Sequence, residues 1–250
     1  MLNKVRIING NVIKILAAVF MLLDHIGLIW NVEILRVLGR LSMPLFAFMI
    51  AEGCRYTKNK LKHFCLIFLL GVFCQIVYAI VNPHEIYLSI LITFSISILV
   101  IYSLQYFKKL VFNEDEKNYK KLLAGLIFIV LVSITYLLNS IERIGDKVFY
   151  IDYGFWGCML PVFASLLDFR NVNLSEKFRW LDGYYLKLFF FSIGTILLSI
   201  SLGKIQWFSL IALIPLSLYG GKKGKSNLKY FFYFFYPMHL AVLYGLNMII

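Results

Sequence analysis

The sequence predicts an all-α, polytopic integral membrane protein. Of its 250 residues, 61% are hydrophobic and only 15% are charged, and this composition is too apolar for an ordinary water-soluble domain. Apolar runs close to the roughly 20 residues of helix that cross a bilayer core recur along nearly the whole chain. Because no polar segment is long enough to form a separate domain, we expect one transmembrane domain over residues 1–250.

Nine apolar segments are predicted to form transmembrane helices. In order, they cover residues 12–31, 34–55, 62–81, 86–106, 121–138, 148–167, 184–202, 205–219 and 229–249. Turn-forming or charged residues separate most of them. From the second segment onward, these separators are Tyr56 to Lys62, Asn82 to Glu85, Lys108 to Lys121, Asn139 to Lys147, Asp168 to Gly183, Gly203-Lys204 and Gly220 to Lys229.

The first segment follows three basic residues, as the apolar part of a signal peptide would. No cleavage site with small residues follows it, so we expect it to remain as the first membrane helix. With the N-terminus in the cytoplasm, only Arg143, Lys147 and Lys204 fall in outer loops, while the other loop lysines and arginines fall inside. This bias predicts a cytoplasmic N-terminus. It also explains the net charge of +12 without a nucleic-acid partner.

Ionisable side chains inside the predicted membrane helices mark the candidate site, because charge in hydrocarbon is costly and usually functional. Asp24 and His25 are neighbours in the first helix, so their side chains point about 100° apart and the histidine needs a partner from another helix. Arg36 and Arg40 are four residues apart in the second helix and share a face. We expect Asp24 to neutralise Arg40 or Arg36.

Helix rise gives the depth of each ionisable group in the membrane. At about 1.5 Å per residue, His25, Arg40, His239 and Asp152 reach a similar layer from four different helices. His25 is the best candidate for a general base or nucleophile, because imidazole titrates near neutral pH.

Glu52 lies about 120° from Arg40 around an ideal helix. It would turn towards the same site only if Pro44 kinked the second helix. We therefore expect Glu52 to be a structural partner of another residue.

Structural roles are equally compatible with several of these residues. A single histidine in a membrane helix often only forms a hydrogen bond between helices, and Arg36 can extend to the outer interface. His239 can cap the break that Pro237 makes in the last helix. From the residues alone, both an enzyme and a proton-coupled transporter or exporter fit. A transporter usually contains paired repeats, and none is visible here, which favours an enzyme.

Four short motifs, in the same order, resemble those of the TraX family, which is named for a factor that acetylates the N-terminus of pilin. They are Met21-Leu22-Leu23-Asp24-His25-Ile26-Gly27, Gly39-Arg40-Leu41-Ser42-Met43-Pro44-Leu45-Phe46-Ala47-Phe48 with Glu52-Gly53, Asp152-Tyr153-Gly154 and Tyr236-Pro237-Met238-His239-Leu240. Together they span residues 21–240. The resemblance implies a multi-pass acetyltransferase of the bacterial cytoplasmic (inner) membrane that uses acetyl-CoA and no metal.

The resemblance also assigns roles to residues. His25 matches the intramembrane histidine of related transmembrane acyltransferases, and it would deprotonate the acceptor or carry the acetyl group. Arg40 would stabilise negative charge, with Asp24 or Asp152 tuning the site. Further residues around the site or on its acceptor side are Arg36, Glu52, Asp152, Tyr153 and His239.

Acetyl-CoA is a cytosolic polyanion, so its phosphates are expected on the basic inner loops. The candidate contacts are Arg55, Lys58, Lys60, Lys62, Lys222, Lys223 and Lys225. The acceptor would be a peptide or pilin N-terminal amine, or a glycan hydroxyl. A noncatalytic assembly factor is a third hypothesis. In each case the lipid bilayer surrounds the protein as a partner.

Overall fold

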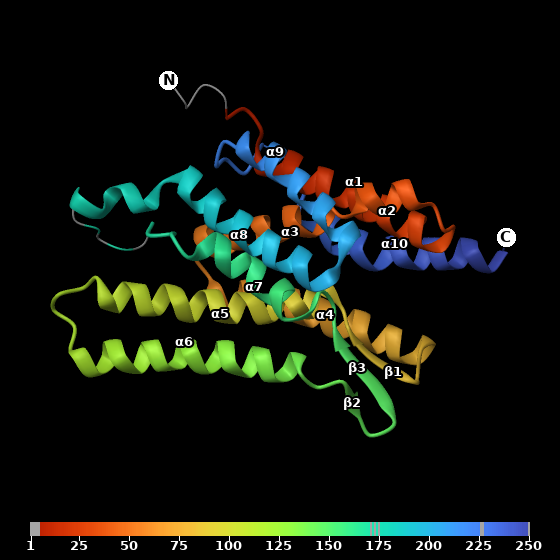
Figure 1. Cartoon of the computed structure of the whole chain (residues 1–250), viewed down its shortest axis with the longest axis horizontal. Coiled ribbons are helices and arrows are strands. Elements are labelled where there is room, and N and C mark those ends of the chain that lie inside the picture. Colours follow the sequence, from red (N-terminus) through yellow and green to blue (C-terminus); the bar gives the residue numbers. More distant parts are fainter. Residues whose placement is uncertain (1–5, 171, 173, 175, 226–227, 250) are drawn as a thin grey trace. The chain divides into compact units, whose positions relative to one another are not determined.

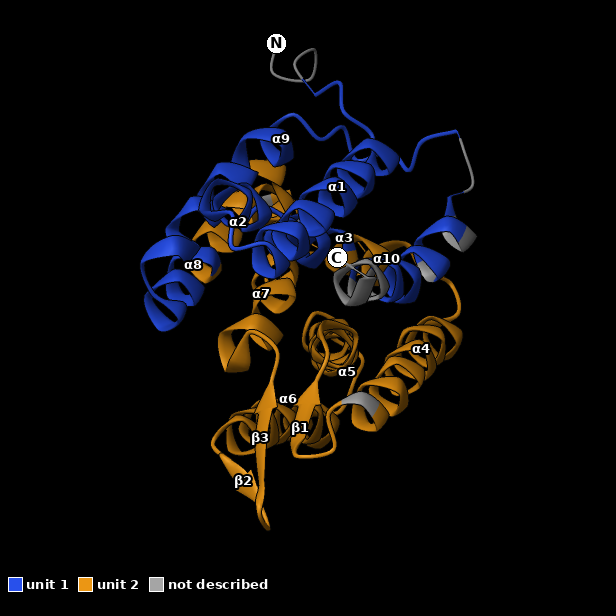
Figure 2. Ribbon diagram, turned by 90° about the vertical axis from the view of Figure 1, so that its right-hand side faces the viewer, with its two compact units in different colours: residues 1–49, 195–250 blue, residues 50–194 orange. Residues whose placement is uncertain are grey.

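A computed structural model describes residues 6–170, 172, 174, 176–225 and 228–249. The chain forms two compact units, which Figure 2 colours separately: unit 1 contains residues 1–49 and 195–250, and unit 2 contains residues 50–194. The predicted single transmembrane domain stays a prediction.

The described residues are mainly helical, and six helical segments are long and apolar enough to cross a membrane. These are α1 (Gly10–Ile29), α2 (Glu33–Gly39) with α3 (Ser42–Tyr56), α4 (Lys60–Val81), α5 (Ile90–Val111), α6 (Asn118–Asn139) and α8 (Tyr184–Leu202). The chain is therefore an all-α polytopic membrane protein, as predicted.

Shorter apolar helices correspond to the other three predicted segments. They are α7 (Gly154–Ser165), the 3-10 helix η3 (Lys204–Ala212) with α9 (Leu213–Ser217), and the apolar part of α10 (Lys229–Ile249). A further 3-10 helix, η2, covers Glu176–Asp182. The number of membrane spans and the cytoplasmic position of the N-terminus stay predictions.

In unit 1, α1 contacts both α2 and α10. Asn9 caps α1 by accepting hydrogen bonds from the backbone N–H groups of Asn11 and Val12. Ile13 and Ala17 of α1, together with Leu45, are fully buried in the core. These contacts fix α1, which carries Asp24 and His25, against the helix that carries Arg36.

In unit 2, α5 contacts α4, α6 and α7, and α5 and α6 run side by side (Figure 1). A three-stranded sheet has the order β1 (Glu85–Leu88), β3 (Lys147–Ile151), β2 (Arg143–Ile144), with β1 and β3 parallel. Large apolar side chains of α6, such as Leu122 and Leu137, are exposed. Exposed apolar helix faces are expected where lipid surrounds a protein.

The structure corrects two of the predicted helix starts. The segments 86–106 and 148–167 begin with strands β1 and β3, and helices α5 and α7 start only afterwards. The strand residues are as apolar as the helices that follow, so composition did not separate them. The short sheet was not predicted.

Pro44, the residue whose kink would be needed to turn Glu52 towards Arg40, interrupts no helix. The second segment breaks earlier, because α2 ends at Gly39 and α3 begins at Ser42. Pro44 then lies in the first turn of α3, where a missing backbone N–H removes no helical hydrogen bond. The break, and not the proline, sets the direction of α3.

Candidate functional site

A carboxylate between two guanidinium groups forms the charged part of the candidate site in unit 1. Asp24 on α1 accepts contacts from Arg36 on α2, at 3.0 Å between Nη1 and Oδ2, and from Arg40 at the end of α2. Each arginine uses a different carboxylate oxygen. Arg40 also donates from Nε to the carbonyl of Arg36 at 3.3 Å. The predicted neutralisation of an arginine by Asp24 therefore takes place with both residues.

The local sequence explains why these residues meet. Asn31 adopts a left-handed conformation with φ of 54° in the turn that joins α1 to α2. This turn folds α2 back beside α1, and the N–H groups of Leu35 and Arg36 bond to the carbonyl of Val32. Gly39 lies against Asp24, with no room for a Cβ atom. The close approach of the two helices thus depends on a tight turn and a glycine.

The side chain of His25 is held in one tautomer by its own helix. Its Nδ1 lies 2.8 Å from the carbonyl oxygen of Met21. A carbonyl can only accept a hydrogen bond, so Nδ1 of the neutral ring carries the proton and Nε2 carries the lone pair. The charges of Asp24, Arg36 and Arg40 act on the same ring. An imidazole with a free Nε2 lone pair is suited to take a proton or attack a carbonyl.

A second histidine lies next to His25. His239 of α10 donates from Nδ1 to the carbonyl of Phe235 at 2.9 Å, which leaves its Nε2 as an acceptor as well. That Nε2 atom is buried and has no hydrogen-bond partner among the described residues. The two ring centroids are 4.9 Å apart, with an angle of 77° between the planes. His239 is thus a ring neighbour of His25 from another helix, whereas the hydrogen-bond partner of His25 Nδ1 is Met21 of the same helix, so the expected partner from another helix stays a prediction.

Glu52 does not join this cluster. It forms an ion pair with Lys187 of α8 inside unit 2, and both side chains are almost completely buried. Lys187 lies in the predicted helix 184–202 but counted among the basic residues of the inner side, so its burial against Glu52 was missed. The sequence feature that could have predicted this burial is a basic residue three positions into an apolar helix.

Asp152 and Tyr153 lie between the end of β3 and the start of α7 in unit 2. The backbone of Asp152 is fixed from both sides, because its N–H donates to Leu88 and its carbonyl accepts from Thr93 Oγ1 at 2.9 Å. Tyr153 has a φ of 61° and precedes the first residue of α7. That Asp152 shares a layer with His25, Arg40 and His239 stays a prediction.

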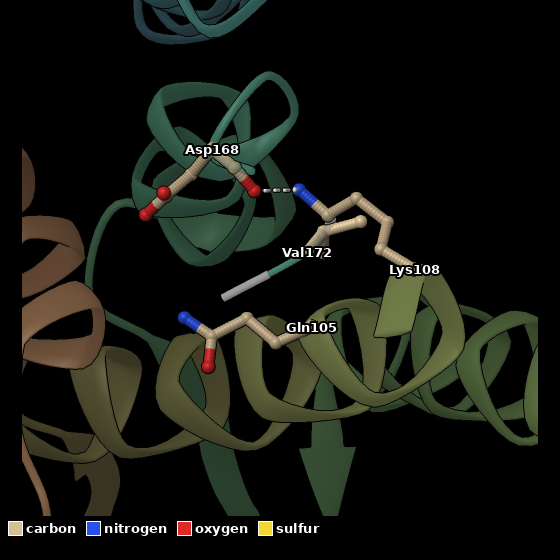
Figure 3. A pocket seen from close by; sticks show the side chains of 4 residues that line it. All are labelled: Gln105, Lys108, Asp168 and Val172. Carbon is tan, nitrogen blue, oxygen red and sulfur yellow. Dashed lines mark hydrogen bonds between the residues drawn. The ribbon is translucent and has the colours of Figure 1, made fainter. Parts of the chain in front are cut away.

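A second polar cluster in unit 2 surrounds Lys108, which sequence reasoning had assigned to an inner loop. Lys108 is buried in α5, and its Nζ donates to the carbonyls of Ser165, Leu166 and Asp168 at 2.8, 3.2 and 2.8 Å. Figure 3 shows the small pocket that Lys108 lines with Gln105, Asp168 and Val172. The exposed C-terminal carbonyls of α7 explain why a lysine is stable there.

The candidate CoA contacts differ in whether they already contact other side chains of the protein. Arg55 is engaged, because its Nε lies 3.3 Å from Asp168 and its Nη2 lies 3.7 Å from Asp182. The ammonium of Lys60 lies 4.9 Å from the centre of the Tyr102 ring. The remaining candidates, which are exposed, are Lys58, Lys62, Lys222, Lys223 and Lys225. Among the residues that the structure describes, no group of three metal-ligating side chains could hold a metal ion.

Comparisons with known proteins agree with the sequence resemblance. The family model described as TraX protein matches residues 9–247. The chain is also similar to the probable fimbrial assembly protein FimC, serogroup H1, of Dichelobacter nodosus, with 26% identity and 94% of each chain covered. No solved structure matches.

Proposed function

Because the chain belongs to the TraX family, we propose that it is an acetyltransferase of the bacterial inner membrane that moves an acetyl group from acetyl-CoA to an amine of a pilin subunit. The fimbrial assembly name of the relative from Dichelobacter nodosus supports a pilin-type acceptor over a glycan hydroxyl. The observation that carries the proposal is the His25 imidazole. Its Nε2 lone pair has no hydrogen-bond donor among the residues that the structure describes, and its neighbours Asp24, Arg36 and Arg40 carry a net positive charge.

In the proposed reaction, His25 Nε2 takes a proton from the acceptor nitrogen as that nitrogen attacks the thioester carbonyl. The carbon–nitrogen bond forms and the carbonyl oxygen gains negative charge, which Arg40 and Arg36 stabilise. Collapse of this intermediate breaks the carbon–sulfur bond. The proton held on His25 then passes to the departing CoA thiolate, so charge and protons balance.

An alternative route keeps the same residues and uses two steps. His25 Nε2 attacks the thioester first, the carbon–sulfur bond breaks, CoA leaves as the thiolate and the ring becomes acetylated. The acceptor amine then attacks the acetyl group, the bond between that group and Nε2 breaks, and the proton lost by the amine passes to the CoA thiolate. The two routes differ in whether the protein itself becomes labelled. Labelled protein in the absence of an acceptor therefore identifies the second route.

The proposal is tested by following label from radiolabelled acetyl-CoA with the purified full-length protein in liposomes. Envelope fractions, pilin-like peptides with a free N-terminus and glycan acceptors are offered in parallel. We expect labelled peptide with the wild type and a loss of at least about a hundredfold for His25→Gln. His84→Gln is the matched control, because His84 is exposed and outside the cluster. Label in the glycan alone would reassign the acceptor.

A proton-coupled transporter is the competing function, and the His25–His239 contact favours it, since two adjacent imidazoles can pass a proton. The same liposomes separate the two functions. A transporter would acidify or alkalinise the lumen in a His25-dependent manner without releasing CoA. Absence of acetyl transfer and of CoA binding, together with such a pH change, would replace the acetyltransferase proposal.

A further inference from the structure

The basic loop Gly220 to Lys225 is fixed to the start of α1, although about two hundred positions separate them in the sequence. Gly10 N–H donates to the carbonyl of Lys222 at 2.7 Å, and Asn11 N–H donates to that of Lys223 at 3.0 Å. The N–H of Gly220 donates to Ile8 at 2.7 Å. These bonds fix two lysines at the beginning of the helix that carries His25.

Lys14 adds a third positive charge at this place. It is partly buried in α1, and the charge of Lys223 acts on it. Among the described residues, no carboxylate pairs with Lys14, Lys222 or Lys223. Partly buried charges are normally paired, and neighbouring like charges repel one another. The cluster is therefore suited to an anion that carries more than one negative charge.

The position of Lys14 on α1 relates the cluster to His25. Eleven residues separate the two, which corresponds to about 16 Å along the helix and to a rotation of about 20° after three turns. They therefore point to one side of α1. Ala18 and Met21, which lie between them on that side, are buried in the core. A ligand that reaches both needs an anionic head and a reactive end separated by a long arm.

An aromatic row on α10 ends at the same histidine pair. The rings of Phe231 and Phe235 are stacked with centroids 5.6 Å apart, and those of Phe235 and His239 are stacked at 5.1 Å. The row starts two residues after the first residue of α10 and ends where His239 contacts His25. It offers an aromatic surface on α10 that leads to the histidine pair.

We infer that Lys14, Lys222 and Lys223 bind the phosphates of the acyl-CoA donor, and that its pantetheine arm runs from there to His25 beside the Phe231–His239 row. The inference rests on the proposed function. It assigns the phosphates to unit 1 and away from the candidate residues Arg55, Lys58, Lys60 and Lys62. Lys14 is a new residue in this role.

The test compares two donors that share the acetyl thioester and differ in phosphates. Acetyl-CoA carries the nucleotide phosphates, whereas S-acetylpantetheine has none. With the full-length protein, Lys14→Gln should lower kcat/KM for acetyl-CoA by about tenfold to a hundredfold, mainly through KM, because one charge-assisted contact is lost. Its kcat/KM for S-acetylpantetheine should stay within about twofold of wild type. Lys117→Gln, an exposed change at the start of α6, is the matched control.

Binding of radiolabelled CoA by equilibrium dialysis separates failure of this inference from failure of the proposed function. If CoA binds the wild type and Lys14→Gln equally, the phosphate site is wrong and the acetyltransferase proposal stands. If the wild type binds no CoA, both are wrong. Lys223→Gln removes an exposed side chain and should weaken CoA binding by a similar factor, so the test does not depend on Lys14→Gln being correctly folded. Lys14→Arg should retain binding.

Discussion

The side chain of Asp24 lies so close to the backbone of Gly39 that a Cβ atom at position 39 would overlap it. This contact joins α1 to the end of α2, immediately before Arg40. The glycine thus determines whether one carboxylate can reach two guanidinium groups. It also marks the break at which α3 takes a new direction.

Gly39→Ala should therefore impair the site more than the fold. The added methyl group must displace Asp24, and overpacking of this kind costs about 1–3 kcal/mol. We expect acetyl transfer to fall at least about tenfold while the protein remains monodisperse in detergent. Gly125→Ala is the control, because a Cβ there would meet only the ring of Phe107, at 3.1 Å. Full activity of Gly39→Ala would show that the position of Asp24 does not matter for transfer.

The two arginines should differ in their contribution to stability. The side chain of Arg40 is 10% exposed and that of Arg36 is 27% exposed. Replacing Asp24 by Asn leaves both guanidinium groups without a counter-charge, which should cost about 3 kcal/mol. Arg36→Gln should restore part of this loss in the Asp24→Asn background by removing one uncompensated charge. The measurement is the unfolding midpoint in detergent for Asp24→Asn, Arg36→Gln, Arg40→Gln and the double variant of Asp24→Asn with Arg36→Gln, and Arg40→Gln should destabilise the protein more than Arg36→Gln does.

The opposite order of destabilisation by Arg36→Gln and Arg40→Gln would contradict this interpretation. If Arg36→Gln alone destabilises the protein more than Arg40→Gln does, burial does not govern the cost of breaking these pairs. If the double variant is as unstable as the sum of the two single variants, Arg36 and Asp24 do not interact energetically.

The charged cluster could be predicted because charge in an apolar helix is rare and needs a partner. Asp24 with the two arginines follows from their spacing and depth alone. The partners of Glu52 and Lys187 could not be predicted, because the positive-inside rule assigns a lysine near a helix end to a loop. Lys187 was within the predicted helix 184–202, and only the tertiary structure shows that it is buried there and reaches Glu52.

Local backbone geometry was the other feature that the sequence did not predict. Strands β1 and β3 contain apolar residues that continue into helices, so hydropathy merges each strand with the next helix. Proline was the obvious cause of a bend in the second segment, yet Gly39 provides the break. Gly39, next to the buried Arg40, is the better predictor of the break, because a side chain at position 39 would overlap Asp24.

The Glu52–Lys187 pair should be a stability element of unit 2. Both side chains are at most 5% exposed, so removing either one takes this partner away from a buried charge. Glu52→Gln and Lys187→Met should each lower the free energy of unfolding by about 3 kcal/mol, and Glu52→Leu with Lys187→Met should recover most of it. Thermal unfolding in detergent measures all three.

An exposed pair in the same unit provides the control for this comparison. Glu116 and Lys120 are also an ion pair, but their side chains are 28% and 45% exposed. Glu116→Gln should cost no more than about 0.5 kcal/mol. Equal effects of Glu52→Gln and Glu116→Gln would mean that burial adds nothing to the Glu52 pair.

His239 should support the chemistry of His25 without replacing it. His239→Phe keeps an aromatic ring against Phe235 but removes the buried Nε2 lone pair. We expect kcat for acetyl transfer to fall about tenfold, less than for His25→Gln, with CoA binding unchanged, because the ring stacking that borders the donor path is retained. The measurement is kcat and KM for acetyl-CoA beside equilibrium dialysis with CoA. If His239→Phe has the wild-type kcat, the lone pair takes no part in proton transfer, and the contact between the two rings serves only to hold α1 against α10.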